Sequence, residues 1–231
     1  MRIVIDRVAK TYVDHQGHAV DALRDVSFSV LLPVSSGEVT FESPPPGRPL
    51  TAMVFQEFAL FPWRTVQGNV EFGLDELGMA VAERGRKARA LIEMTGLAGF
   101  EARYPHQLSG GMRQRVAIAR ALAVDSAALL MDEPFSALDA QTRQLMQDEL
   151  LARWEQARTT ILYVTHDIQE AVYMADRVVV LSRRPGRVLA EIVVPLKRPR
   201  TEAMQAEPGY LGAVERIWSL IKDQARAALI E

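Results

Sequence analysis

The sequence predicts an α/β fold in which a mostly parallel sheet is joined by an antiparallel β part near the amino end and a helical part in mid-chain. Apolar runs at residues 127–131 and 161–164 are each followed by polar residues, and a helical pattern lies between them. This alternation of strand, helix and strand is typical of parallel sheets. The chain has 231 residues, 48% of them hydrophobic, which is enough for one substantial core. We therefore expect a single domain with subsidiary parts.

The antiparallel part is expected at the front of the chain. Strand-forming runs occur at residues 3–5, 26–30, 39–41 and 53–55. A loop is predicted from Tyr12 to Asp21, and the proline-rich residues 44–47 predict a second loop before the strand at 53–55.

Helical periodicity dominates the middle and the end of the chain. The pattern is helical from residue 66 to about residue 124, with the charged residues 83–89 on a solvated face. A third apolar run at 178–181 precedes an amphipathic helix predicted at 210–230. We divide the domain into an antiparallel part with a truncated core (1–56), a helical subdomain (57–125), the main core (126–190) and a tail with a helix (191–231).

Composition excludes several functional classes. The formal net charge is −2, so no overall basic field favours nucleic acid as a partner. The absence of cysteine excludes disulfides and thiolate chemistry. The amino end carries Arg2, Asp6, Arg7 and Lys10 and shows no secretory signal, and no window resembles a membrane span. We expect the chain in the cytoplasm, with any membrane role exerted through a partner.

Two adjacent carboxylates follow the apolar run 127–131. A buried parallel strand delivers its last side chains to the carboxyl edge of the sheet, where α/β proteins bind ligands. There Asp132 could hold Mg²⁺ through water, and Glu133 could orient or deprotonate an attacking water. By itself this pattern also fits the end of an ordinary core strand.

A glycine-rich helix start lies upstream of these carboxylates. Ser109, Gly110 and Gly111 open a helix, and glycines there let backbone N–H groups approach an anion. The plain alternative is a serine N-cap. Asp132 follows Gly111 by 21 residues, and this spacing favours the functional interpretation. On this helix we expect Met112, Val116 and Ala119 to face inward, and Arg113 and Arg120 outward.

At this point the chain resembles the ATP-binding subunits of ABC transporters over nearly its whole length. The resemblance implies a RecA-like P-loop NTPase core of the ABC type, with ATP and Mg²⁺ as cofactors. It assigns Glu133, His166 and Gln56 to catalysis, and Asp132 and Gln56 to the metal. It assigns nucleotide contacts to Tyr12, which would stack on adenine, and to Ser109, Gly110, Gly111, Gln114 and Asp139.

Further segments are similar to importers of the nitrate, sulfonate and taurine type. These are the segment from Phe58 to Val66 with Asn69 and Val70, and residues 184–187 and 195–200. The resemblance implies that residues 58–63, hereafter loop 58–63, form a groove for a permease subunit. It also implies pairing with a second copy or a related ATPase subunit, and an indirect link to a periplasmic or lipoprotein substrate-binding protein. It also implies a peripheral position on the inner face of the cell membrane. Alternatively, these aromatic residues pack internally as a small satellite core.

One part of the family pattern is missing from this sequence. The phosphate-binding loop G-x-x-x-x-G-K-[ST] has no counterpart, since none of the four lysines follows a glycine. Val30 runs directly into Leu31, where a strand, the loop and a helix of about 25 residues in total would stand. Apolar burial contributes about 25 cal/mol per Å², against a net stability of about 5–15 kcal/mol. We expect a destabilised or rearranged core.

Three interpretations follow. The first is an ordinary importer ATPase whose sequence is recorded without this module, the second a degenerate, non-hydrolysing subunit that lends residues 109–111 to an intact partner. The third is a soluble ABC ATPase that acts on nucleic acid or ribosomes. The acidic balance and loop 58–63 argue against the third.

Overall fold

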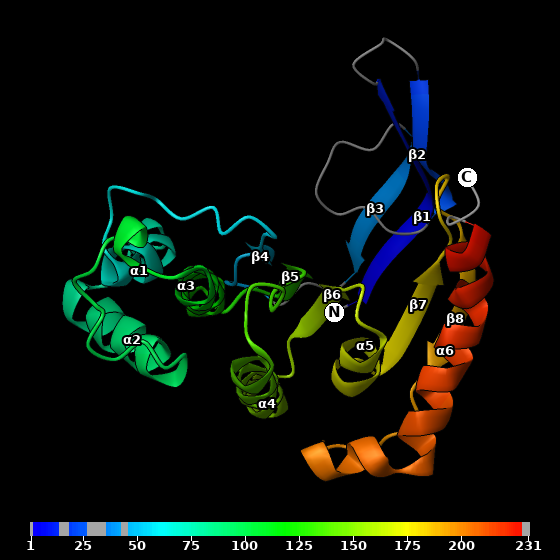
Figure 1. Ribbon diagram of the computed structural model, residues 1–231. Coiled ribbons are helices and arrows are strands. Elements are labelled where there is room, and N and C mark those ends of the chain that lie inside the picture. Colours follow the sequence, from blue (N-terminus) through cyan, green and yellow to red (C-terminus); the bar gives the residue numbers. More distant parts are fainter. Residues whose placement is uncertain (1, 14–18, 27–35, 43–45, 228–231) are drawn as a thin grey trace. The chain divides into compact units, whose positions relative to one another are not determined.

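The computed structural model describes residues 2–13, 19–26, 36–42 and 46–227 (Figure 1). The junction between Val30 and Leu31 lies outside these ranges. The chain forms two compact units, one made of Met1–Pro44 with Asp167–Glu231 and the other of Pro45–His166. Each unit is described by itself below, and the four-part division expected from the sequence stays a prediction.

The second unit is built around a parallel sheet. Its strands are β4 (Thr51–Val54), β5 (Ala128–Asp132) and β6 (Thr160–Val164), in the order β4-β5-β6. Both pairings are parallel, and β5 is the central and most buried strand. The parallel core that the two apolar runs predict is confirmed, and it brings the ends of β5 and β6 to one edge.

Helices supply the rest of the second unit. They are α1 (Val66–Glu76), α2 (Val81–Met94), the 3₁₀ turn η1 (Pro105–Gln107), α3 (Gly110–Ala123) and α4 (Ala140–Ala157). α1, α2 and α3 pack on one another (Figure 1). α3 is the most enclosed of the three because residues 116–119 are all fully buried. The predicted helical segment is therefore real, and α3 is its inner member.

An antiparallel sheet opens the first unit. β1 (Arg2–Val13) lies between β2 (Ala19–Val26) and β3 (Ser36–Glu42). The predicted antiparallel part is confirmed. The loop predicted from Tyr12 to Asp21 is wrong at both ends, because Tyr12 pairs with Val20 and Val13 with Ala19. β-branched and aromatic residues there extend the hairpin. The predicted strand at 26–30 lies almost wholly outside the described residues.

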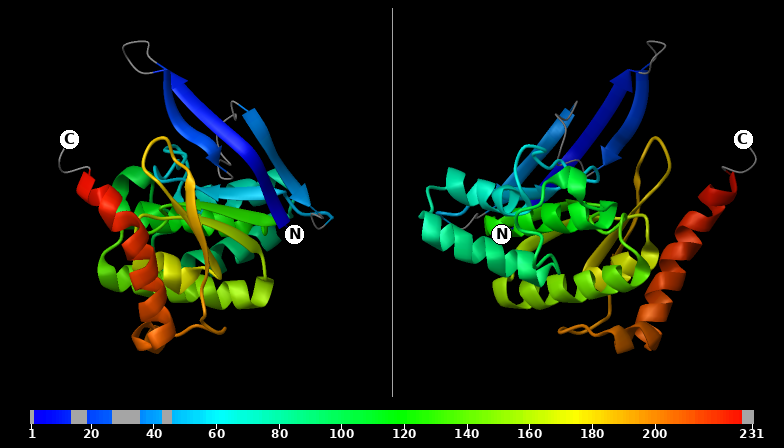
Figure 2. Two further views of the ribbon diagram at one scale, coloured as in Figure 1. Left: turned by 90° about the vertical axis from the view of Figure 1, so that its right-hand side faces the viewer. Right: turned by 60° about the vertical axis from the view of Figure 1, so that its left-hand side comes forward.

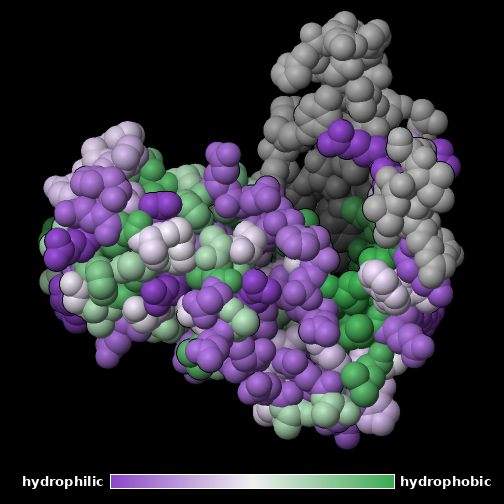
Figure 3. Space-filling model, in the orientation of Figure 1, coloured by the Kyte–Doolittle hydropathy of each residue, from purple (hydrophilic) through white to green (hydrophobic). Residues whose placement is uncertain are grey.

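The remaining elements of the first unit follow residue 166. They are α5 (Ile168–Met174), β7 (Arg177–Leu181), β8 (Val188–Val193), η2 (Glu202–Ala206) and α6 (Pro208–Ala227). Within the described residues, β7 pairs antiparallel with β8. α6 packs on α5 and runs beside this hairpin (Figure 2). Hydrophobic residues gather around α5 and α6 on the face shown in Figure 3.

The tail segment 195–200 has a structural role that the sequence did not reveal. Arg200 is buried, and its Nη1 donates to the carbonyls of Val172, Tyr173 and Ala175 at 3.1, 2.7 and 2.8 Å. Burial, with the charge of Arg198, lowers the pKa of Arg200 to about 10. A cation at the end of a helix satisfies carbonyls that have no intrahelical partner. This segment therefore caps α5. No helix among the described residues has the length and apolar character of a membrane span.

Candidate functional site

The site begins at the turn that ends β5. Glu133 has a positive φ of 45°, a backbone conformation that costs a residue with a side chain about 1–3 kcal/mol. Its N–H donates to the carbonyl of Val164 at 2.9 Å. Its own carbonyl accepts from the N–H and the hydroxyl of Ser136 at 3.2 and 3.0 Å. Phe135 is buried below the turn. The surrounding residues thus hold the strained turn in place.

Three residues predicted to be catalytic meet at this turn. The Glu133 carboxylate has Oε1 2.8 Å from His166 Nδ1, and Oε2 accepts from the Gln56 amide at 3.3 Å. The His166 side chain is 76% exposed and that of Glu133 only 22%. The structure therefore brings a recessed carboxylate and an accessible histidine together, as the order of strands β4, β5 and β6 requires.

Asp132 adds a second carboxylate at the same edge. Partial burial, and then the charge of Glu133, raise its pKa. The hydrogen-bond partners described for Glu133 are an amide and a histidine, so no arginine or lysine balances the pair there. Carboxylate oxygens are the ligands that Mg²⁺ prefers. The pair therefore fits a divalent cation, with Asp132 as the residue that would hold it. No group of three His, Cys, Asp or Glu suited to a metal occurs in the described ranges.

The glycine-rich start of α3 lies against the turn after β5. Ser109 is exposed and caps α3, its hydroxyl accepting from the Met112 N–H at 3.2 Å. A Cβ on Gly111 would lie 3.2 Å from the Leu138 side chain and 3.4 Å from the Ala137 carbonyl. A side chain at this position would therefore crowd the turn. A Cβ on Gly110 would meet nothing within 4 Å.

Asp139 and Gln114 occupy supporting positions in this chain. Asp139 caps α4 by accepting from the Thr142 N–H at 3.0 Å, and this hydrogen bond lowers its pKa. Gln114 is fully buried, and its Nε2 lies 3.4 Å from the Glu133 carbonyl. Gln114 thus lies against the turn that carries Glu133, and its predicted contact with nucleotide stays a prediction. Tyr12 belongs to the first unit, and its stacking on adenine also stays a prediction.

Loop 58–63 divides into packed and exposed residues. The Phe61 ring lies 4.5 Å from that of Phe72, and the Phe58 ring lies 5.2 Å from the Arg113 guanidinium. Trp63 is 72% exposed. Part of the loop therefore forms a satellite core and Trp63 remains on the surface, while the groove for a permease subunit stays a prediction.

Two residues hold this loop in a role that the sequence did not predict, although Asn69 belongs to the importer-like segment. Asn69 on α1 is fully buried and bonds both the N–H and the carbonyl of Phe61, at 2.8 and 3.2 Å. Arg120 was expected to face outward. It is partly buried, and it donates to the carbonyls of Ala59 and Phe58 at 2.7 and 3.4 Å. Asparagine on a buried face of a helical pattern was the one signal available.

The second unit has a parallel core with two acidic residues at the end of its central strand. A helix that begins with glycines lies against the following turn. This arrangement is typical of nucleotide hydrolases. The ABC transporter family model matches residues 28–136. The chain is 43% identical over 197 residues to the taurine import ATP-binding protein TauB of Yersinia pestis, covering 82% of this chain and 77% of that one. This chain belongs to the family of ABC transporter ATP-binding proteins.

Two further relatives and one solved structure support this family assignment. The chain is 46% identical over 176 residues to the nitrate import ATP-binding protein NrtD of Synechocystis, covering 74% of this chain and 66% of that one. It is 50% identical over 177 residues to an uncharacterized ABC transporter ATP-binding protein of Methanocaldococcus jannaschii, covering 77% of this chain and 65% of that relative's length. A dimeric ATP-binding cassette solved in a post-hydrolysis state with ADP and Pi matches with a TM-score of 0.73 at 28% identity, covering 85% of this chain and all of that one.

Proposed function

We propose that this chain is the ATP-binding subunit of an importer for a small anion such as nitrate, a sulfonate or taurine. The observation that carries the proposal is the cluster of Glu133, His166 and Gln56, in which one carboxylate oxygen lies beside a histidine and the other beside an amide. The similarity to proteins named for nitrate and taurine import supports the substrate class.

The chemistry of this cluster follows from its geometry. Bound MgATP would supply the transferable phosphoryl group and a cation to neutralise its developing charge. Glu133 would orient a water and take its proton, because one carboxylate oxygen can exchange its present partner for that water. His166, exposed just after the next strand, would contact the terminal phosphate. Asp132 would hold the metal through water, and Gln56 would monitor both metal and water.

This proposal requires a phosphate-binding loop. No Gly-Lys pair occurs in the 231 residues, so this sequence offers no lysine of that kind for the phosphates. We propose an ordinary ATPase, of which the 231-residue sequence is a shortened record that lacks the module between Val30 and Leu31. Two subunits would then enclose two ATP molecules, with Ser109 to Gly111 of each chain facing the other chain's phosphate loop.

A second candidate function rests on the sequence itself. If the module is truly absent, the chain is a degenerate subunit that lends its residues 109–111 to an intact partner. Mixing with a complete homologue should then restore ATP hydrolysis, and no gain at any mixing ratio would exclude this role.

The intact mass of the protein purified from its native host separates the two candidates. A mass near 25.7 kDa supports the degenerate subunit, and a mass heavier by a few kilodaltons supports the complete ATPase. We also propose that a permease subunit docks on the exposed Trp63 and so holds the chain at the inner face of the cell membrane. Co-purification of a membrane subunit with the native chain, lost in Trp63→Ala, tests this docking; retention of the subunit would contradict it.

A further inference from the structure

Arg120 is a partly buried cation without a carboxylate partner among the described residues. Its guanidinium donates to the main-chain carbonyls of Ala59 and Phe58 and lies 5.6 Å from the centre of the Phe61 ring. Burial lowers its pKa, so the charge is kept at a cost in free energy. Such a cost is expected where the guanidinium fixes a backbone that cannot otherwise satisfy its polar groups.

The carbonyls that Arg120 binds belong to a strained stretch of backbone. Ala59 has a φ of 46°, which a residue with a Cβ seldom adopts. The later half of the loop is held separately, because Asn69 on α1 accepts from the Phe61 N–H at 2.8 Å and donates to the Phe61 carbonyl at 3.2 Å. Loop 58–63 therefore has two anchors: α1 holds its end, and α3, through Arg120, holds its beginning.

The opposite end of α3 reaches the catalytic turn. Gln114 lies under the Glu133 carbonyl, and Gly111 approaches the side chain of Leu138 closely. Between the two ends, residues 116–119 are fully buried, so the helix cannot shift at one end without repacking along its length. One packed element thus touches both the loop and the turn that carries Glu133.

We propose that Arg120 is a positioning residue that couples the conformation of loop 58–63 to the amino end of α3. A partner segment docked on the loop would act on Ser109 to Gly111 through this one side chain. That last consequence rests on the proposed function, whereas the coupling itself is a property of this chain alone.

The chain contains a matched control for this role. Arg115 lies on the same helix and is also partly buried, and burial lowers its pKa as well. It donates to the carbonyls of Thr95 and Gly96 at 3.0 and 2.9 Å. Arg115 therefore makes the same kind of contact, from α3 to a different loop.

The test is a double-mutant cycle read by hydrogen exchange, and it needs neither ATP nor a permease. Phe61→Ala perturbs the loop, and the reporter is the exchange rate of peptides covering residues 108–114, which contain neither Arg115 nor Arg120. We expect Phe61→Ala to accelerate this exchange at least about fivefold, which corresponds to about 1 kcal/mol of coupling. In the Arg120→Met background, Phe61→Ala should accelerate the exchange of the same peptides by less than about twofold. On Arg115→Met it should retain its full effect.

Two outcomes would overturn the proposal: an unchanged exchange rate at 108–114 after Phe61→Ala, or an equal response in the Arg120→Met and wild-type backgrounds. If Arg120→Met does not fold, Arg120→Lys serves instead, because it keeps the charge and loses the fork that spans two carbonyls. If Arg120 only stabilises the fold, Arg120→Met and Phe61→Ala would each lower the stability of the protein, and their effects on the exchange rate would be additive. Failure of the importer assignment would appear in the mass and co-purification measurements and would leave this cycle unaffected.

Discussion

Strand β5 is flanked by two acidic residues with the same unusual backbone and opposite surroundings. Asp125, before the strand, and Glu133, after it, both have φ of 45°. The Asp125 carboxylate pairs with Lys87 and, at 3.0 Å, with Arg153. The Glu133 carboxylate has no such cation in its described contacts. Both ends hold a strained turn, but only the carboxyl end leaves its charge available.

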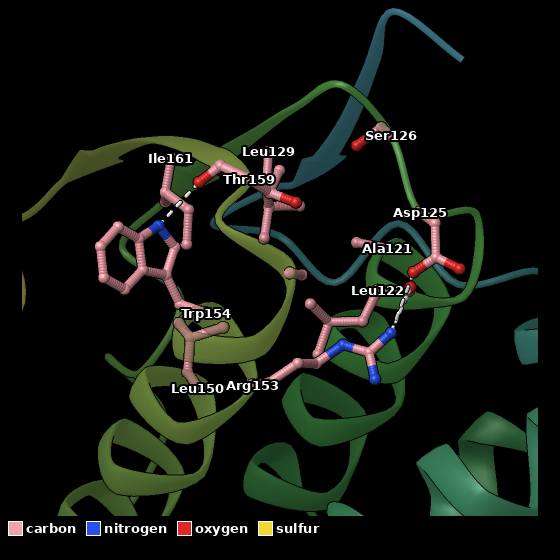
Figure 4. Close-up of a pocket in the computed structure, with 11 residues that line it drawn as sticks. Ala121, Leu122, Asp125, Ser126, Leu129, Leu150, Arg153, Trp154, Thr159 and Ile161 are labelled. Carbon is pink, nitrogen blue, oxygen red and sulfur yellow. Dashed lines mark hydrogen bonds and ion pairs between the residues drawn. The ribbon is translucent and has the colours of Figure 1, made fainter. Parts of the chain in front are cut away.

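Hydrogen bonds and ion pairs around Asp125 hold the chain together at the amino end of the sheet. Arg48 donates to the Asp125 carbonyl at 2.5 Å. Trp154 on α4 donates to the Thr159 carbonyl at 2.7 Å. Beside these groups is a small, mostly apolar pocket, where Arg153 reaches across to Asp125 (Figure 4). A carboxylate fixed by permanent cations stabilises a fold. A carboxylate beside an amide and a histidine can exchange partners for water, a metal or a proton.

The largest expected difference between the two ends is in turnover. Glu133→Gln keeps the shape and the hydrogen bonds of the turn but removes the proton acceptor, and we expect ATP turnover to fall by about 10²–10³-fold. The assay is ATP hydrolysis by the transport complex purified from the native host. Asp125→Asn in the same complex is the control and should leave turnover unchanged. Equal losses in both variants would remove the functional distinction between the ends.

For the stability of the protein, the acidic residue at the amino end of the strand is the one expected to matter. Asp125→Asn keeps a residue that tolerates positive φ and removes the charge that meets Lys87 and Arg153. These pairs are part exposed, so we expect the free energy of unfolding to fall by only about 1 kcal/mol. Urea denaturation at low salt measures this loss, which should shrink in high salt. A loss that does not depend on salt would mean that the ion pairs are not its cause.

Strain at the carboxyl end predicts a gain in stability. Glu133→Gly relieves the positive φ and removes the repulsion from Asp132, so the free energy of unfolding should rise by up to about 1 kcal/mol. Asp125→Gly relieves the same φ but also loses its ion pairs, and its net change should be near zero. Paired urea denaturation curves of the two glycine variants compare them directly. A less stable Glu133→Gly would show that the turn is not strained.

The same contrast explains what the sequence predicted and what it did not. Strand periodicity predicted the parallel strands β5 and β6, and the family resemblance singled out Gln56 and His166. The parallel pairing of β4 with β5, which brings Gln56 to Glu133, was not predicted, because the strand at 53–55 was grouped with the antiparallel part. Periodicity could not predict that Arg120 faces inward, since its acceptors are loop carbonyls 61 and 62 residues away in the chain. The cap formed by Arg200 was hidden for the same reason. Contacts between side chains and distant main chain leave no pattern in the sequence.

The smallest expected effect is the pH dependence at the carboxyl end. The folded state raises the pKa of Asp132, so in the window from the ordinary carboxyl pKa, about 3.9, up to the raised value, the folded chain binds more protons than the unfolded chain. The contribution of Asp132 to stability therefore falls as pH rises through this window. Asp132→Asn should gain stability relative to wild type over the same range and then keep that advantage at higher pH.

Asp139 supplies the control of opposite sign. The Thr142 N–H lowers its pKa, so its contribution is present above the ordinary carboxyl pKa and is lost as pH falls through the lowered folded value. Asp139→Asn should thus lose stability relative to wild type as pH rises, where Asp132→Asn gains. Thermal denaturation of the three proteins between pH 3 and pH 7 measures both differences. Two curves of the same sign would mean that Asp132 is not held against ionisation, and that burial and the charge of Glu133 do not raise its pKa at this end of the strand.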